Sequence, residues 1–333
     1  MTENRLPTKI RVSVGSAIVL ELMRGKLDTS PTTIYLLTYY EGKCSANCGF
    51  CPQARTSTSR VDMLSRVTWP AFPTKDVVSK IASAWQKKTI QRVCIQAINY
   101  LGVFDALRAL TTEIRLIANV PVSVSCQPLN KSQMRLLAEA GVNRVSVALD
   151  AATEELFNKV KGAFTCGPYD WEKQKKTLEE AVQVFGKGSV STHLIVGLGE
   201  TERQIIETIQ WCVDSDVYPS LFAFTPISGT TLEGLPQPSM ASYRRIQLAR
   251  HLIVFGKTRF ENMKFDGDGR IIDFGVSRPL LKKVVENSSS FQTSGCPGCN
   301  RPYYNEKPSG PIYNYPRPLT PNESKEVEKA LEI

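Results

Sequence analysis

Two kinds of hydrophobic pattern alternate along this chain. Short runs rich in Val, Ile, Thr and aromatic residues are separated by segments in which apolar residues recur every three or four positions. The first pattern is typical of strands and the second of amphipathic helices. The predicted strands are residues 32–40, 91–98, 120–126, 144–149, 190–198 and 220–227, with weaker candidates at 261–266 and 270–275.

The clearest helical patterns cover residues 74–88, 130–142, 201–216 and 242–256. Asn130 is a suitable N-cap, whereas Gly141 and Gly256 are suitable stops. Strands that alternate with helices in this way pair in parallel through right-handed crossovers. The pattern therefore predicts an α/β fold, a (β/α)8 TIM-like barrel that is complete or nearly complete.

The composition changes near the end of the chain, which suggests a division into three parts. Residues 1–30 are expected to be an N-terminal extension, and residues 31–285 the barrel. Residues 286–333 are rich in cysteine and proline and have no helical period until a final short helix. We expect this C-terminal tail to fold back and close the barrel, because it is too irregular to form a domain of its own.

Length and charge narrow the classes of protein. The chain has 333 residues, 42% of them hydrophobic, which is enough for a large buried core. Its apolar runs are shorter than the roughly 20 residues of a membrane span, and its first residues lack a signal-peptide pattern. We therefore expect a cytoplasmic protein without a membrane partner. The net charge of +9 favours anionic partners, but no Lys/Arg block is long enough to predict nucleic-acid binding.

The chain contains nine cysteines, an odd number that fits metal ligation better than a disulfide framework. Three of them, Cys44, Cys48 and Cys51, form a C-x3-C-x2-C motif directly after the first predicted strand. In a barrel, this is the end that carries the active site. Three thiolates can hold three irons of a 4Fe–4S cluster and leave the fourth iron open to a small molecule. A zinc site, which usually uses C-x2-C pairs, and incidental clustering of thiols are the alternatives.

The motif, with Phe50 before its last cysteine, resembles the cluster loop of the radical S-adenosylmethionine (SAM) superfamily. The segment "CSANCGFCPQAR" is similar to the loop of biotin synthase, and "SVALD", "IVGLGET" and "FTPISGTTLEG" are similar to later strands of that family. The resemblance implies a 4Fe–4S cluster that binds SAM and cleaves it to a radical. It also implies SAM contacts by Phe50, Asp150, Ile195 and Gly197, with Asp150 on the ribose.

Biotin synthase also carries a 2Fe–2S cluster, held by three cysteines and one arginine. The resemblance matches two of those ligands with Cys94 and Cys126, but the third cysteine position is Ser191 and the arginine position lies near Lys264. The tail supplies Cys296 and Cys299 in a "GCPGC" segment. Four thiols, Cys94, Cys126, Cys296 and Cys299, are predicted to hold an auxiliary 4Fe–4S cluster.

Several of these residues have simpler interpretations. Cys296 and Cys299 also fit a zinc knuckle or a redox pair, and Cys94 alone would be an ordinary buried strand cysteine. Cys166 and Cys212 are expected to be bystanders, the first free in a loop and the second packed in a helix. His193 is either a packed, hydrogen-bonded histidine or a substrate contact.

The barrel, the altered ligands and the tail together resemble one component of the two-protein, archaeal-type lipoyl synthases. This implies a sulfurtransferase of lipoate biosynthesis that attaches sulfur to an octanoyl chain on a protein lysine, with the first of two insertions favoured and the auxiliary cluster as sulfur source. The implied partners are an acidic octanoyl or lipoyl carrier domain, a second radical SAM lipoyl synthase component and an electron donor such as a ferredoxin. Biotin synthase, another radical SAM enzyme with a small substrate, and a non-catalytic iron–sulfur protein remain alternatives.

Overall fold

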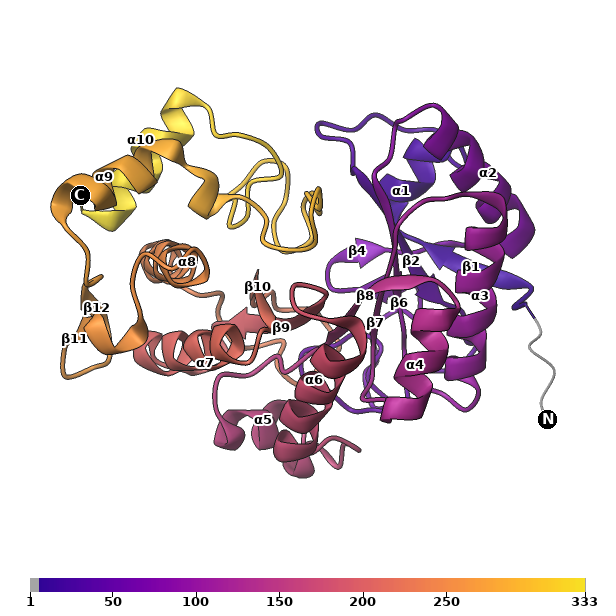
Figure 1. Cartoon of the computed structure of the whole chain (residues 1–333), viewed down its shortest axis with the longest axis horizontal. Helices are drawn as coiled ribbons and strands as arrows, with labels where there is room; N and C mark the ends of the chain where they lie inside the picture. Colours follow the sequence, from indigo (N-terminus) through magenta and orange to yellow (C-terminus); the bar gives the residue numbers. More distant parts are fainter. Residues whose placement is uncertain (1–5, 333) are drawn as a thin grey trace.

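A computed structural model describes residues 6–332 and shows a curved, mostly parallel sheet with helices on its outer face (Figure 1). The strand order is β10-β9-β8-β7-β6-β2-β1-β5. Six parallel strands form the barrel wall: β2 (Thr33–Thr38), β6 (Arg92–Gln96), β7 (Val122–Cys126), β8 (Val142–Val147), β9 (Val190–Val196) and β10 (Tyr218–Ala223). All six coincide with the strongly predicted strands.

The sheet is a partial barrel, so the nearly complete form of the prediction is confirmed. The two weak strand candidates form β11 (Lys264–Phe265) and β12 (Ile271–Asp273), an antiparallel pair outside the main sheet. Instead, β1 (Lys9–Val12) and β5 (Ala71–Pro73) extend the wall, with β1 antiparallel to both β2 and β5. The segment expected to be an N-terminal extension thus contributes a strand to the sheet.

Helices follow most of the strands and cover the outside of the wall. They are α1 (Val14–Val19), α2 (Thr74–Gln86), α3 (Val103–Ile117), α4 (Lys131–Glu139), α5 (Glu154–Val160), α6 (Trp171–Phe185), α7 (Glu202–Asp214), α8 (Met240–Val254), α9 (Arg278–Asn287) and α10 (Pro321–Leu331). Short 3-10 turns lie at Ala163–Thr165, Phe260–Asn262 and Ser289–Phe291, and a small hairpin joins β3 (Met63–Leu64) to β4 (Val67–Thr68). No helix within residues 6–332 has the length and apolar character needed to cross a membrane.

Local sequence explains where several helices begin. Asn130 and Gln133 form a capping box at α4, as do Thr201 and Gln204 at α7. In each box the two side chains satisfy otherwise unpaired backbone N–H groups of the first turn. The predicted N-cap at Asn130 is therefore confirmed.

Strand alternation separates the wall into two faces. On β2, Ile34 and Leu36 pack in the large core beneath the helices, whereas Tyr35 and Leu37 pack in a second, interior cluster with Cys94. This is the period of two expected for a strand buried on both faces. The interior face is the one that carries the candidate site.

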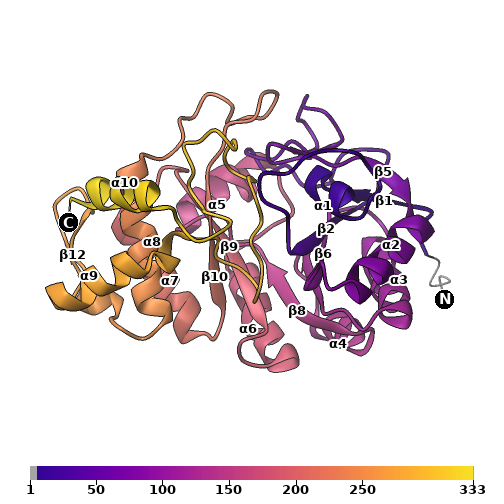
Figure 2. The ribbon, with the colours of Figure 1, turned by 90° about the horizontal axis from the view of Figure 1, so that it is seen from above.

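The tail closes the lateral opening between β10 and β2, on the two sides of the partial barrel (Figures 1 and 2). Asn300 donates from its amide to the Ser30 carbonyl (2.9 Å) and accepts from the Thr32 N–H (3.0 Å). On the other side, the Ser294 hydroxyl accepts from the Leu221 N–H of β10 (2.8 Å). The prediction that the tail folds back to close the barrel is thus confirmed.

The tail also has more regular structure than its composition predicts. Helices α9 and α10 pack against α8 through a separate hydrophobic cluster that includes Leu252, Val285, Phe291 and Val327. The predicted final helix is present, and Thr320 and Glu323 form its capping box. This cluster anchors both ends of the irregular segment that enters the barrel.

Candidate active site

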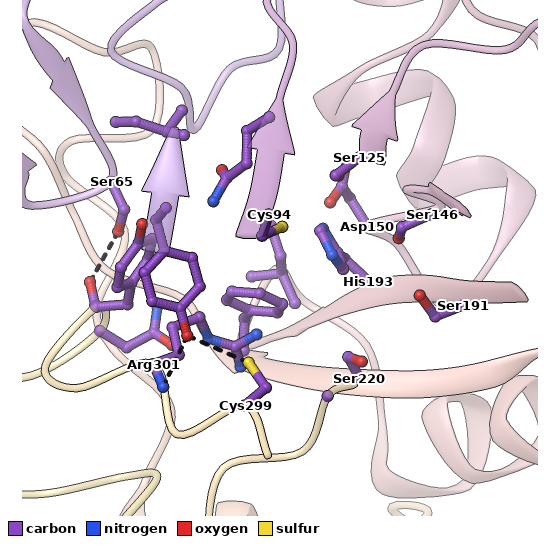
Figure 3. Close-up of a pocket in the computed structure, with 18 of the residues that line it drawn as sticks. Ser65, Cys94, Ser125, Ser146, Asp150, Ser191, His193, Ser220, Cys299 and Arg301 are labelled. Carbon is purple, nitrogen blue, oxygen red and sulfur yellow. Dashed lines mark hydrogen bonds between the residues drawn. The ribbon is translucent and has the colours of Figure 1, made fainter. Parts of the chain in front are cut away.

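A cavity of about 220 Å³ lies inside the partial barrel (Figure 3). Its wall combines residues of the cluster loop, the interior faces of the strands and the tail. Serine hydroxyls are prominent, with one or two on each of four neighbouring strands: Ser123, Ser125, Ser146, Ser191 and Ser220. Of the predicted cofactor contacts, Phe50, Asp150 and Ile195 line this cavity.

The cluster loop follows β2 directly and is fixed by its own backbone. The Cys44 N–H donates to the Gln53 carbonyl (2.9 Å), and the Ser45 N–H donates to the Asn99 carbonyl (2.7 Å). The Cys44 sulfur accepts from the Asn99 N–H (3.1 Å). These bonds hold the loop over the carboxyl ends of β2 and β6.

The three loop thiols are near enough to influence each other. Burial raises the pKa of the Cys48 thiol, partly offset by the nearby Lys161 ammonium, and burial raises the pKa of Cys51 to about 12. For Cys48 and Cys51, the neighbouring thiols add to this effect. Because a bound metal ion deprotonates its thiol ligands, a positively charged iron centre would relieve this cost.

The donor set fits an iron–sulfur cluster. Three thiols on one loop, without a carboxylate or imidazole among them, are the ligands that iron–sulfur centres prefer. Within residues 6–332, no three His, Cys, Asp or Glu side chains stand close enough to hold a single metal ion. By their number and type, the loop cysteines Cys44, Cys48 and Cys51 would hold a 4Fe–4S cluster, and that group would supply reductive SAM cleavage.

Asp150 lies at the cavity wall in a left-handed backbone conformation, with φ of +66°. It bridges to β9: its N–H donates to the His193 carbonyl and its carbonyl accepts from the Ile195 N–H, both at 2.8 Å. Lys161 donates to its carboxylate at 2.7 Å, and both side chains are buried. The carboxylate is therefore held in place at the end of β8.

Gly197 does not line the cavity among the described residues, but it shapes the turn after β9. Its φ is +104°, and a Cβ there would lie 2.8 Å from Pro238. The Glu200 carboxylate accepts from the N–H groups of Gly197 (2.6 Å) and Leu198 (3.0 Å). Gly197 therefore fixes the backbone beside the cavity and does not itself contribute to the wall.

A second group of thiols comes from β6 and from the tail. Cys94, Cys296 and Cys299 all line the cavity (Figure 3 labels two of them). The Cys299 sulfur lies 3.2 Å from the Tyr35 hydroxyl, and the Cys296 sulfur lies 3.4 Å from the Ser123 hydroxyl. The structure thus places the two tail thiols on the same cavity wall as the strand thiol.

Cys126 does not join them. It is buried in the large core beneath the helices, and no neighbouring thiol or cation contributes to the raised pKa of about 12 that burial gives it. Lys264, near which the arginine ligand of biotin synthase would fall, is exposed on β11 outside the main sheet. The structure therefore places Cys126 apart from the other three predicted ligands, on the core-facing side of its strand.

Sequence reasoning missed Arg301, which directly follows the "GCPGCN" segment. Its guanidinium lies 3.7 Å from the centre of the Phe222 ring and donates to the Leu221 carbonyl (3.3 Å). Its N–H donates to the Tyr35 hydroxyl (2.9 Å). A buried arginine two residues after a cysteine was the available signal, since arginine is rarely buried without a role.

Some buried polar groups of the cavity wall have no hydrogen-bond partner within the described chain. Among them are the Arg144 Nε, the Ser146 hydroxyl and the Asn305 amide oxygen. His193 also lines the cavity, and burial lowers its pKa to about 4, so the imidazole is neutral at pH 7. Unpaired buried polar groups of this kind are those that a polar ligand would satisfy.

This fold and this thiol loop together define a class of protein, the barrels that bind an iron–sulfur cluster. A family model described as "Radical SAM superfamily" matches residues 41–212, more than half of the 333-residue chain. The chain therefore belongs to the radical SAM superfamily.

Relatives in sequence include a biotin synthase of Persephonella marina, 28% identical over 61% of this chain and 57% of that protein. Another is a biotin synthase of Beijerinckia indica, 26% identical over 59% of each chain. The chain thus matches less than two thirds of these relatives' length.

Similar solved structures include methylornithine synthase, with a TM-score of 0.53 and 16% identity over 73% of this chain and 67% of that one. The FeFe-hydrogenase maturase HydG from Carboxydothermus hydrogenoformans has a TM-score of 0.51 and 14% identity over 73% of this chain and 55% of that one. At these identities the likeness supports the fold alone.

Proposed function

We propose that this radical SAM protein inserts sulfur into an octanoyl chain carried on a protein lysine, as one of two insertions in lipoyl cofactor biosynthesis. The observation that carries the proposal is the convergence of two separate thiol groups on one cavity. Cys51 enters it from the cluster loop, and Cys94, Cys296 and Cys299 enter it from the strands and the tail. A cavity between a radical source and a sulfur source is what C–S bond formation requires.

When bound, the loop cluster with SAM supplies a hydrogen-abstracting radical, and an auxiliary cluster supplies the sulfur. The protein's own residues bind and orient SAM and the substrate. Asp150, held by Lys161, would accept from ribose hydroxyls, and Phe50 and Ile195 provide apolar surface for the nucleoside. The Tyr35, Trp69 and Tyr304 rings, packed 5.5 to 6.0 Å apart, shield the interior beside Cys94 from water.

The cavity also suits an unbranched acyl chain. The apolar atoms of its wall come from Phe222, Phe224, Leu64 and the aromatic cluster, while serine hydroxyls punctuate the strands. The Arg301 guanidinium is engaged by Phe222 and two carbonyls, whereas Arg144 also lines the cavity and its buried Nε has no hydrogen-bond partner within the described chain. The apolar part of the wall supports an alkyl chain as the substrate.

The outer surface of the cluster loop offers a place for carrier and electron donor. Loop residue Asn47 donates to the Thr165 carbonyl (2.9 Å), and Ser45 bonds to Asn99, so the segments with Leu101 and Phe164 flank the loop. Leu101 is fully exposed and Phe164 is 73% exposed. With exposed Arg55 between them and a net charge of +9, this surface suits an acidic carrier domain or an acidic ferredoxin.

The test is an anaerobic reaction of the reconstituted protein with SAM, a one-electron reductant and an acidic carrier domain octanoylated on its lysine. We expect 5′-deoxyadenosine and a carrier that gains the mass of one sulfur atom, with C8 as the favoured position. A carrier whose octanoyl group loses hydrogen without gaining sulfur would contradict the proposal. The partner component, added afterwards, should complete the second insertion.

A second candidate is sulfur insertion into the sulfur-free precursor of biotin, which the sequence relatives favour. The same assay with that precursor distinguishes the two substrates. A third reading, a non-catalytic iron–sulfur protein, predicts cluster binding without SAM cleavage in either assay.

A further inference from the structure

The parity of strand β7 separates its cysteine from the cavity. Successive side chains of a strand point to opposite faces, and Cys126 is three residues from Ser123. Ser123 and Ser125 line the cavity, as does part of Val124, whereas Val122 and Cys126 pack in the core beneath the helices and do not line it. For the Cys126 side chain to face the cavity, the register of β7 would have to shift by one residue. That shift would turn Ser123 and Ser125 toward the helices.

The other three thiols line the cavity, Cys94 from β6 and Cys296 and Cys299 from the tail. Cys94 is paired in register with Tyr35 of β2 on one side and Ser123 of β7 on the other. The tail thiols contact those same two neighbours, with Cys299 at Tyr35 and Cys296 at Ser123. The "CPGC" turn therefore spans three strands directly over Cys94.

The hydroxyls of Ser123 and Tyr35 each already accept a hydrogen bond. The Ser123 hydroxyl accepts from the Arg92 guanidinium (2.9 Å), and the Tyr35 hydroxyl accepts from the Arg301 N–H (2.9 Å). The only other thiol among the described residues of the cavity wall is Cys51, which belongs to the cluster loop. The chain thus offers three ligands at this place, all facing the cavity.

We propose that the auxiliary cluster is held by Cys94, Cys296 and Cys299 alone, and that its fourth iron is open on the cavity side to an exogenous thiol or sulfide. This inference rests on the proposed function, because it assumes an auxiliary cluster. Sulfur ligands are the expected class, since iron–sulfur irons prefer soft donors. In this arrangement Cys126 is a packing residue, because its side chain lies in the core beneath the helices and not at the cavity.

The experiment uses a Cys44→Ala/Cys48→Ala/Cys51→Ala background, in which the auxiliary site alone can bind a cluster. Iron and sulfide content and Mössbauer spectra are recorded after anaerobic reconstitution with ⁵⁷Fe. We expect about four irons per chain, one of which differs from the rest and shifts when ethanethiol is added. Adding Cys126→Ala should leave the iron content and the spectrum unchanged, whereas adding Cys94→Ala should abolish both.

Cys212→Ala is the matched control, since Cys212 is a fully buried cysteine on α7 that faces no cavity. Loss of iron with Cys126→Ala, but not with Cys212→Ala, would overturn the three-thiol set and leave the proposed function standing. A Mössbauer spectrum with four equivalent irons that does not change when ethanethiol is added would contradict the open position on the fourth iron. A background that folds by circular dichroism and binds no iron would overturn the auxiliary cluster itself, and with it the proposed sulfur source.

If the triple background does not fold, the same single variants are compared in the otherwise wild-type chain saturated with SAM. There the expectation is about eight irons for wild type, Cys126→Ala and Cys212→Ala, and about four for Cys94→Ala.

Discussion

The Lys161 ammonium lies 2.7 Å from the Asp150 carboxylate, and this ion pair is buried beside the cavity. Lys161 also donates to the Ala148 carbonyl and lies over the Tyr169 ring. An ion pair in this environment holds both partners in fixed positions. It therefore orients the acid at the point where the ribose of SAM is expected.

If one partner of this ion pair is removed, the other remains as an unpaired buried charge and should lower the free energy of unfolding. Lys161→Met leaves a buried carboxylate unpaired, and we expect a loss of about 3 kcal/mol in the free energy of unfolding. Lys161→Met/Asp150→Asn should lose clearly less than the sum of the single changes. Urea unfolding of the four proteins measures this cycle, and strict additivity would contradict a coupled pair.

The neighbouring exposed pair provides the control for this prediction. Lys159 and Glu155 lie 2.6 Å apart on the same helix, with more than half of each side chain exposed. Lys159→Met should change the free energy of unfolding by less than about 1 kcal/mol, because water already solvates both charges.

Gly197 should tolerate no side chain. In Gly197→Ala the new Cβ would meet Pro238 at 2.8 Å while the residue keeps a positive φ, so we expect a loss of about 2 to 3 kcal/mol. Gly102→Ala is the control, because Gly102 has a φ of +89° with open space around it. It should lose only about 1 kcal/mol from backbone strain, measured in the same thermal or urea unfolding experiment.

Glu306 should make stability depend on pH. Burial raises its pKa from 4.5 to about 7, against the opposing effect of Arg301, Arg244 and Arg66. Between these values the folded state binds a proton that the unfolded state has lost, so stability falls as pH rises through 4.5 to 7. Glu306→Gln should remove this slope and be more stable than wild type at pH 8, by about 3 kcal/mol at most.

Glu323 is the opposite case and serves as the control. Its pKa is lowered to about 2 by hydrogen bonding to Arg317. Glu323→Gln should therefore be less stable than wild type at neutral pH, and the two should converge as the pH falls toward 2. Unfolding curves at several pH values test both signs, and parallel pH profiles for all three proteins would contradict the assignment.

Cys166 should be the fastest thiol to react. It is exposed, whereas Cys126 and Cys212 are buried and burial raises the pKa of both thiols. Because the thiolate is the nucleophile, iodoacetamide should alkylate Cys166 first in the reconstituted protein. Peptide mass spectrometry over time identifies the site, and Cys166→Ser should remove the fast phase. Early labelling of Cys126 would show that its strand opens readily.

Hydrophobic periodicity predicted the six parallel strands, because each is a buried run of β-branched and aromatic residues. It could not separate the hairpin at Lys264 from a barrel strand, since two residues of pairing depend on distant contacts. The resemblance and the tail motif likewise grouped Cys94, Cys126, Cys296 and Cys299, and the structure places Cys126 in the core and the other three at the cavity, because similarity to a known ligand position says nothing of strand parity. The alternation "VSVSC" does contain that parity, with both serines on one face and the cysteine on the other.

Asn300 attaches the tail segment of the cavity wall to the residues just before β2. Its amide donates to the Ser30 carbonyl and accepts from the N–H and the hydroxyl of Thr32, three bonds that hold the "CPGCN" turn against the start of β2. Asn300→Ala removes all three, so we expect local destabilisation of about 1 to 2 kcal/mol and amide exchange roughly ten-fold faster across residues 296–301. Hydrogen exchange mass spectrometry measures this directly.

The same variant tests whether the turn retains the auxiliary cluster. If Cys296 and Cys299 are ligands, a loosened turn should release iron to a chelator faster than wild type, while iron at the Cys44 loop leaves at the unchanged rate. Asn287→Ala, an exposed asparagine at the end of α9, should alter neither exchange nor release. Faster exchange without faster iron release would mean that the turn closes the barrel but holds no metal. Faster release with unchanged exchange would place the effect of Asn300 at the cluster and not at the β2 contact.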